Sequence, residues 1–170
     1  MPLHRGNVVD VTISGINKGV AGAPGELRGY FGAVKRGTLL GNTPCGVFGI
    51  YRELPDGLDA TAYPVGTREQ IREGEARVLC TLASGERREY AVSLSAIDRD
   101  ATGSKCFTVK ITDDALLAET GGIVQGMSGS PILQDGRLVG AITHVLINNP
   151  TVGYGIFIEN MLAEMGELAS

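Results

Sequence analysis

A chain of 170 residues with a formal net charge of -4 is the size of one ordinary domain, and its charge gives no reason to expect binding to nucleic acid or to an anionic membrane. Glycine is abundant at 25 residues, and apolar residues make up 43% of the chain. Together with many short runs of Val, Ile and Leu, this composition favours an all-β fold over a helical one. We therefore expect a single domain over residues 1–170.

Short β-branched segments separated by glycine-rich turns occupy the first two thirds of the sequence. The expected strands are Val8–Ile13, Tyr30–Val34, Thr38–Leu40, Gly46–Tyr51, Ala62–Val65, Ala76–Leu82, Glu89–Ile97 and Lys105–Ile111. In the last three, apolar residues alternate with polar or small ones, which predicts one buried and one solvated face.

Helical patterns are few. A helical turn is expected at Thr67–Gln70, with Thr67 as its cap, and about one further turn at Asp114–Thr120. Pro55–Gly57 predicts a β-turn. The one clear helix runs from about Phe157 to Leu168, because its apolar residues recur every three to four positions and form one face.

The three cysteines, Cys45, Cys80 and Cys106, have neither the count of a disulfide framework nor the spacing of a metal site. Two of them are able to pair in an oxidising compartment, but we interpret all three as small buried residues. We expect no metal and no cofactor. The first seven residues lack the apolar core of a signal peptide, and no apolar run is long enough to span a membrane.

A serine in a glycine-rich loop precedes a β-hairpin. Ser128 lies within Gly126–Pro131, and the strand pattern that follows has Asp135-Gly136 at its turn. This order is typical of chymotrypsin-type serine peptidases, in which a base activates the hydroxyl and backbone N–H groups stabilise the oxyanion. We assign Ser128 as nucleophile and the N–H groups of Gly126 and Ser128 as the oxyanion hole. The alternative is an ordinary Gly/Ser turn between two strands.

The strand after the hairpin is expected to bind substrate. Thr143, His144 and Val145 would pair through their backbone with an extended peptide, and the His144 ring would line a subsite. The following segment, residues 149–155, is predicted to be a loop that walls the specificity pocket. No acidic residue lies between Thr143 and Ile158, so we expect a small or apolar side chain before the cleaved bond.

A set of motifs covers nearly the whole chain: Gly121–Ile132, Gly140–Val145 and Asn149–Ile156, with weaker matches at Thr112–Leu117 and Gly25–Gly29. These motifs resemble the SpoIVB peptidase family of spore-forming bacteria. The resemblance implies a serine endopeptidase with a chymotrypsin-like barrel. By the same resemblance, the enzyme would act outside the cytoplasmic membrane during sporulation and cleave a regulatory partner of a membrane-embedded protease.

The resemblance also implies site residues. Ser128 matches the nucleophile of the family, and Asp113, fifteen positions upstream, matches its essential aspartate. Asp113 would either orient a catalytic histidine or shape the serine loop from outside the triad, and Asp114 competes for the same role.

The catalytic histidine of the family would precede residue 1, as would a PDZ domain and a membrane anchor. We therefore expect a peptidase domain truncated at its N-terminus, soluble and inactive by itself, with an unpaired barrel edge that favours self-association. Neither His4 nor His144 is expected to replace the missing base. The alternative is a non-catalytic peptide-binding barrel that retains the serine loop.

Overall fold

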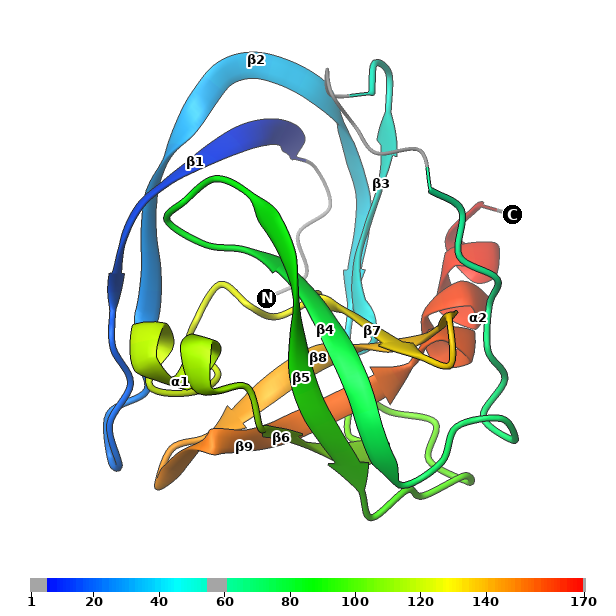
Figure 1. Ribbon diagram of the computed structural model, residues 1–170. Coiled ribbons are helices and arrows are strands. Elements are labelled where there is room, and N and C mark those ends of the chain that lie inside the picture. Colours follow the sequence, from blue (N-terminus) through cyan, green and yellow to red (C-terminus); the bar gives the residue numbers. More distant parts are fainter. Residues whose placement is uncertain (1–5, 55–60, 170) are drawn as a thin grey trace.

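A computed structural model describes residues 6–54 and 61–169 as two β structures with two short helices (Figure 1). A three-stranded antiparallel sheet has the order β1-β2-β3, and six later strands form a closed barrel in the order β4-β5-β6-β9-β8-β7. The sheet strands are β1 (Asn7–Asn17), β2 (Glu26–Thr43) and β3 (Gly46–Tyr51). The barrel strands are β4 (Gly74–Thr81), β5 (Arg87–Ser95), β6 (Phe107–Ile111), β7 (Pro131–Gln134), β8 (Arg137–Leu146) and β9 (Asn149–Phe157). The expected all-β, chymotrypsin-like fold with a C-terminal helix is confirmed.

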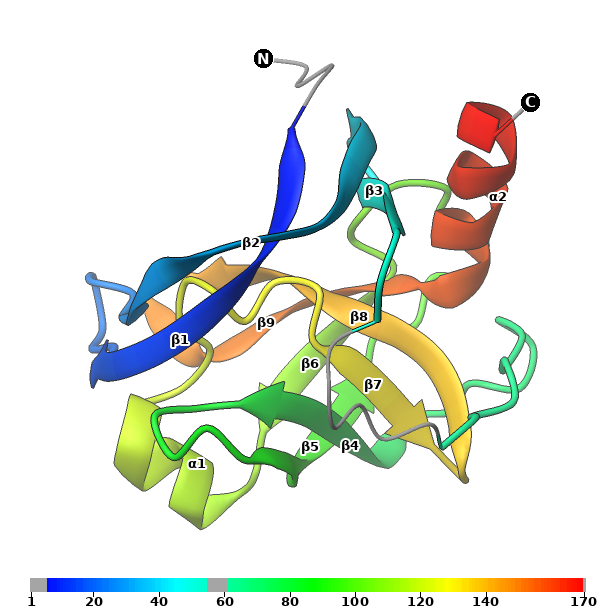
Figure 2. The ribbon, with the colours of Figure 1, turned by 90° about the horizontal axis from the view of Figure 1, so that it is seen from above.

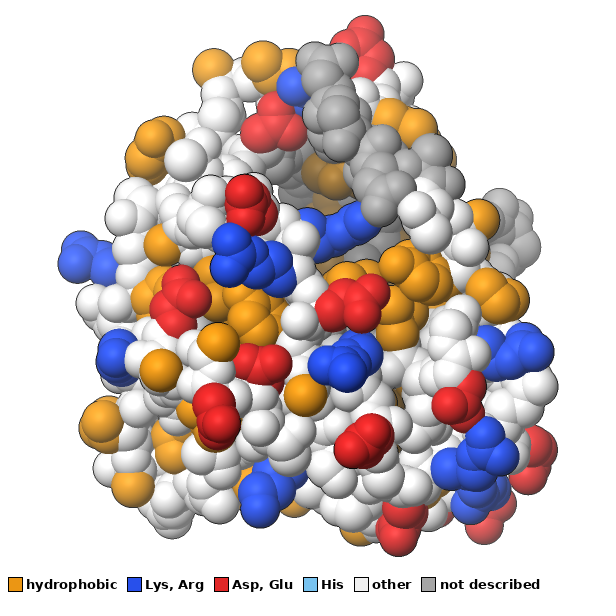
Figure 3. Space-filling view, viewed as in Figure 1, with side chains coloured by type: hydrophobic (Ala, Val, Ile, Leu, Met, Phe, Trp, Pro, Cys, Tyr) orange, Lys and Arg blue, Asp and Glu red, His pale blue; other side chains and the backbone are white. Residues whose placement is uncertain are grey.

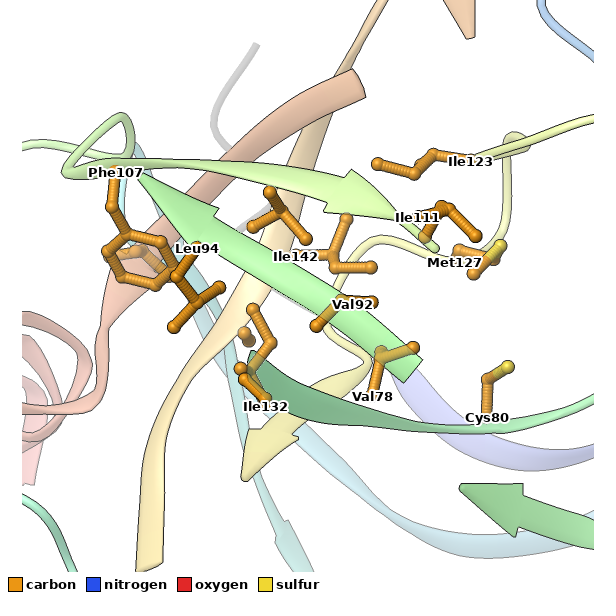
Figure 4. Close-up of a cluster of buried hydrophobic side chains, with 14 of the residues drawn as sticks. Val78, Cys80, Val92, Leu94, Phe107, Ile111, Ile123, Met127, Ile132 and Ile142 are labelled. Carbon is orange, nitrogen blue, oxygen red and sulfur yellow. The ribbon is translucent and has the colours of Figure 1, made fainter. Parts of the chain in front are cut away.

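The hydrophobic core fills the barrel. Alternate residues of each strand point inward, such as Val92 and Leu94 on β5 and Phe107 and Ile111 on β6 (Figure 4). This arrangement follows from the period of two that the sequence shows in these strands, because successive side chains lie on opposite faces. Cys45, Cys80 and Cys106 are free thiols and buried, as expected.

The three-stranded sheet is a curved ribbon that arches over one side of the barrel (Figures 1 and 2). Its central strand, β2, is one continuous strand of 18 residues, so the prediction of two separate strands at Tyr30–Val34 and Thr38–Leu40 was wrong. The first part of β2 pairs with β1 and the last part with β3. Register shifts between Val8 and Val11 let the ribbon bend without ending the strand.

Residues 149–155 were predicted to be a loop, and this prediction was wrong, because they form most of the strand β9. Its glycines serve close packing and not turns. A Cβ on Gly153 would lie 2.1 Å from the carbonyl oxygen of His144, and one on Gly155 would lie 2.2 Å from the Phe107 ring. The segment Ala62–Val65 is also not a strand, since only Val65 forms an isolated bridge, with Leu138. The predicted turn Pro55–Gly57 lies outside the described residues.

The two helices lie on opposite sides of the barrel (Figures 1 and 2). α1 (Asp114–Thr120) has seven residues, and α2 (Ile158–Ala169) begins one residue later than expected. Arg68 stabilises the position of the start of α2, because its guanidinium donates to Oδ1 of Asn160 at 2.8 Å and lies over the Phe157 ring. Thr67 does not cap a helix; Thr67–Gln70 is a turn in which the Thr67 N–H donates to Oε1 of Gln70. Within residues 6–54 and 61–169, neither helix has the length and apolar composition needed to cross a bilayer.

Candidate active site

Two consecutive tight turns form the loop that carries Ser128. The N–H of Met127 donates to the carbonyl of Val124 at 3.1 Å, and the N–H of Ser130 donates to the carbonyl of Met127 at 3.0 Å. The third residue of each turn is a glycine with positive φ, +99° at Gly126 and +89° at Gly129. This is the pattern of a type II turn, which a residue with a side chain adopts only with strain. Ser128 is thereby held at the second position of the second turn, where it is exposed.

The start of β2 braces this loop. The N–H of Gln125 donates to the carbonyl of Gly25 at 2.8 Å, and the N–H of Leu27 donates back to the carbonyl of Gln125 at 2.8 Å. Gly126 packs on Leu27 so closely that an added Cβ would lie 3.1 Å from the Leu27 side chain. This segment is part of the weaker family match at Gly25–Gly29. Nothing in its sequence predicted that it contacts the serine loop.

Thr120 links the other side of the loop to α1. Its side chain is fully buried, and Oγ1 lies within hydrogen-bond distance of the carbonyl oxygens of Leu116 and Gly122, to either of which its one hydrogen can be donated, and accepts from the Gly122 N–H. The carbonyl of Thr120 accepts the N–H of Gly19 at 2.8 Å, which joins the β1–β2 connection to the same point. The segment entering the serine loop is therefore fixed by hydrogen bonds from two directions.

Four of the six backbone N–H groups from Gln125 to Ser130 are hydrogen-bonded. Those of Gln125, Met127, Gly129 and Ser130 donate to backbone carbonyls. In the described part of the chain, the N–H groups of Gly126 and Ser128 have no backbone or side-chain acceptor. These are the two groups that the sequence assigned to an oxyanion hole, and both belong to exposed residues. A developing oxyanion requires backbone N–H donors without other acceptors beside the reacting hydroxyl, and these two groups meet that requirement.

Ser128 lines a cleft of about 390 Å³ between the barrel and the β2–β3 turn. Its Oγ donates to the carbonyl oxygen of Thr143 at 2.9 Å. The opposite wall is the turn formed by residues 42–47, which includes Cys45. No pattern in the sequence indicated that this turn belongs to the site.

The strand edge expected to bind substrate lies in the same cleft. β8 pairs with β7 only as far as Ala141 but with β9 as far as Leu146. Beyond Ile142, which bonds to Gly129 and Ser130, no described strand pairs with the second edge of β8. Thr143 occupies a register shift, and its Oγ1 lies 2.7 Å from the carbonyl oxygen of Ser104. Thr143 and His144 line the cleft, and Val145 follows them on the same strand.

Asp113 is the N-cap of α1. Its Oδ1 accepts the N–H of Leu116 at 3.0 Å, and its Oδ2 accepts the N–H of Ala91 on β5 at 3.2 Å. The hydrogen bond from Leu116 is the main cause that holds the pKa of this carboxyl below its ordinary value. Both oxygens are engaged in positioning α1 against the barrel. Asp114, its competitor in the sequence, is in the first turn of the helix and is exposed.

His144 is exposed in the cleft wall, but the Ser128 hydroxyl is directed to the Thr143 carbonyl and not to an imidazole. His4 lies outside the described residues. Within the described ranges, no cluster of three or more His, Cys, Asp or Glu side chains has the geometry of a metal site.

Comparison with solved structures places this fold among trypsin-like proteases. The HtrA-type protease AlgW with a decapeptide superimposes with a TM-score of 0.53 and 16% identity, covering 96% of this chain and 50% of that one. The active form of the Rv3671c protease from M. tuberculosis gives a TM-score of 0.50 and 16% identity, covering 89% and 66% of the respective chains. The chain thus spans about half the length of AlgW.

Sequence comparisons are more specific. No curated protein matches the chain significantly. The family model of the SpoIVB peptidase S55 matches residues 1–162, nearly the whole chain. The chain therefore belongs to the SpoIVB peptidase S55 family.

Proposed function

We propose that residues 1–170 form the peptidase domain of a serine endopeptidase in which Ser128 is the nucleophile. The observation that carries this proposal is the pair of available N–H groups, on Gly126 and Ser128, beside an exposed hydroxyl that lines a cleft. Membership of a peptidase family and the trypsin-like fold support the same reaction class.

The reaction would begin when Oγ of Ser128 bonds to the carbonyl carbon of the scissile peptide while a base takes its proton. The carbonyl oxygen becomes an oxyanion that accepts hydrogen bonds from Gly126 and Ser128. When the C–N bond breaks, the amine leaves with the proton that the base returns. Water then hydrolyses the acyl ester and restores the serine.

The substrate would lie as an extended strand along the free edge of β8, with Thr143, His144 and Val145 contacting it. The AlgW structure holds a decapeptide, which is consistent with a peptide ligand for this fold. A small or apolar residue before the scissile bond suits this site. No acidic residue lies between Thr143 and Ile158 to pair with a basic side chain there.

Asp113 would act from outside a catalytic triad. Of the two roles that its sequence match left open, the bonds of both carboxylate oxygens to backbone N–H groups favour positioning of α1 and of the loop that follows it. The base of the reaction would be neither His144 nor His4, so the isolated chain would react slowly.

By membership of the family, the biological role we propose is sporulation signalling. An exported, membrane-associated enzyme would cleave a regulatory partner of a membrane-embedded protease. The runner-up function is binding of extended peptides without turnover.

The test is covalent labelling with a fluorophosphonate probe, with and without added imidazole as an external base. We expect slow labelling of Ser128, accelerated by imidazole, and its loss in Ser128→Ala. Ser130→Ala is the matched control, two residues further along the same loop, and should label like the unchanged chain. A probe that attaches elsewhere, or a chain that stays unlabelled even with imidazole, would favour the non-catalytic alternative.

A further inference from the structure

An apolar groove leads away from the serine loop on the side opposite the β8 cleft. It consists of two adjoining hollows of about 330 and 590 Å³ that share Leu27, Thr81 and Gly126. One wall is the β1–β2 ribbon, and the other is the end of β4. Figure 3, in the orientation of Figure 1, shows hydrophobic side chains at the surface over the β1–β2 ribbon and around the β4–β5 hairpin.

The ribbon presents large apolar side chains to this groove without covering them. Val11 and Phe31 are partners in the β1–β2 register, line the outer hollow, and are 51% and 81% exposed. Ile13 and Leu27 continue the same face toward Gly126. Apolar side chains at this level of exposure are characteristic of ligand-binding grooves.

The opposite wall offers a free strand edge. β4 pairs with β5 over its whole length but with β7 only at Arg77 and Val78. The next residue of β7 in this register is Pro131, which has no N–H to continue the ladder. Residues 79–81 of β4 therefore have no strand partner on that edge within the described chain, and they line the inner hollow.

The groove and the β8 cleft meet at the serine loop. Ser128 and Gly129 line the cleft, and Gly126, Met127 and Gly129 line the inner hollow. A peptide that lies along β8 and crosses Ser128 would continue into the groove. There its backbone would meet the β4 edge, and alternate side chains would meet Val11 and Phe31.

We propose that this groove binds the part of an extended peptide substrate that follows the scissile bond, and that it selects apolar side chains there. The proposal rests on the proposed role of Ser128, because that residue defines which part of the peptide follows the cleaved bond. The occupant is a peptide, because a free strand edge and an apolar wall adjoin the loop that carries the nucleophile.

The probe for the test is a fluorescein-labelled octapeptide of alternating leucine and serine, compared with the same peptide in which serine replaces every leucine. Binding is measured by fluorescence anisotropy to the 170-residue chain carrying Ser128→Ala, which keeps the peptide intact. A photoreactive benzophenone at one leucine position locates the contact by mass spectrometry. We expect tighter binding of the leucine peptide and crosslinks to Val11, Phe31 or Thr81.

Two neighbouring residues provide matched variants. Phe31→Ser should weaken binding about tenfold or more, the loss expected for removing a large apolar contact. Tyr30→Ser, on the opposite face of β2 and 62% exposed, should change binding by less than about twofold. Both side chains are exposed, so neither change should disturb folding, and circular dichroism checks this.

Three outcomes would overturn the inference. They are an equal loss of peptide binding in the two variants, no preference for the leucine peptide, and a groove occupied by a second copy of the chain that the peptide does not displace. If Ser128 labels with fluorophosphonate but Phe31→Ser leaves binding unchanged, this inference fails while the proposed function stands. If Ser128 does not label but the groove still distinguishes the peptides, the proposed nucleophile fails instead and peptide binding by the groove survives.

Discussion

The same apolar residue types are buried in the barrel and exposed in the three-stranded sheet. Val109 and Ile132 of the barrel are 0% exposed, whereas Val47 and Ile50 of β3 are 63% and 57% exposed. Closure of the barrel gives each strand two neighbours and encloses one core, but the sheet has two edges and buries only some of its apolar side chains, such as Phe48. Stability therefore belongs mainly to the barrel, and the sheet is available to bind and to shape the site.

The candidate site lies where these two regions meet. The serine loop belongs to the barrel half, since it connects α1 to β7. The brace at Gly25–Leu27 and the cleft wall at residues 42–47 belong to the two ends of β2. A closed barrel carries the serine loop, and a more exposed ribbon contacts that loop and forms one wall of the cleft. This difference predicts different responses to mutation in the two halves.

The largest expected effect is on stability, and it compares one substitution in both regions. Ile132→Ala leaves a cavity in the barrel and should lower the free energy of unfolding by about 2–5 kcal/mol. Ile50→Ala in the sheet should cost less than about 0.5 kcal/mol, because its side chain is already exposed to water. Urea unfolding of the two variants measures both. Similar losses would contradict the assignment of stability to the barrel.

The second prediction concerns the contact between the two regions at Gly126. An added methyl group meets Leu27 and strains a backbone with φ of +99°, so Gly126→Ala should displace the N–H group that we propose as an oxyanion donor. We expect the rate of fluorophosphonate labelling to fall by about 10²–10³-fold, as for loss of one such donor. Gly136→Ala, with φ of +72° at the distant hairpin turn, has comparable strain and should label normally.

Buried hydrogen bonds at Thr120 provide a third test. Thr120→Val removes the hydroxyl that bonds to Leu116 and Gly122 and should cost about 1–3 kcal/mol. Thr120→Ser keeps the hydroxyl and should retain most of the stability that the valine variant loses. Thermal unfolding distinguishes them, and a valine variant as stable as the serine one would show that these bonds do not fix the loop.

The smallest effect is expected at Asp113. Asp113→Ala removes the cap of α1 and should cost about 1 kcal/mol, whereas Asp113→Asn keeps a capping oxygen and should cost less. The pKa of this carboxyl is lowered on folding, so its contribution is present above its unfolded pKa of about 4 and is lost as the pH falls through the folded value. The stability difference between the unchanged chain and Asp113→Ala should therefore narrow below about pH 4.

Asp113→Asn also distinguishes the two roles of this residue. In an enzyme whose triad joins Asp113 to a catalytic histidine, the same change would lower kcat for peptide hydrolysis by about 10⁴-fold. A positioning role predicts a loss of less than about tenfold, because a destabilisation of about 1 kcal/mol or less leaves nearly all molecules folded.

Local patterns in the sequence predicted the parts of this molecule that depend on neighbours along the chain. The alternating strands predicted at Ala76–Leu82 and Glu89–Ile97, the Asp135-Gly136 turn and the serine loop follow from alternation and turn chemistry. β9 was missed because Gly153 and Gly155 have the composition of a turn, while their function is to let β8 and Phe107 pack closely. Close approach between distant segments leaves no local signal.

The same limit applies to the site. Six consecutive residues predicted a tight glycine-rich loop around Ser128, and the structure has that loop; the assignment of Ser128 as nucleophile and of the two N–H groups as oxyanion donors stays a prediction. The brace from Gly25 to Gln125, the cleft wall at residues 42–47 and the groove beside Phe31 involve segments separated by about 80 to 100 positions. These contacts arise only after the ribbon folds back over the barrel, so a single sequence does not reveal them.

The most direct test of the central claim is a crystal structure of the chain after reaction with a fluorophosphonate. We predict a bond from phosphorus to Oγ of Ser128, with the phosphoryl oxygen within about 3 Å of the backbone nitrogens of both Gly126 and Ser128. An adduct on another serine, or a phosphoryl oxygen directed away from these two nitrogens, would contradict the account.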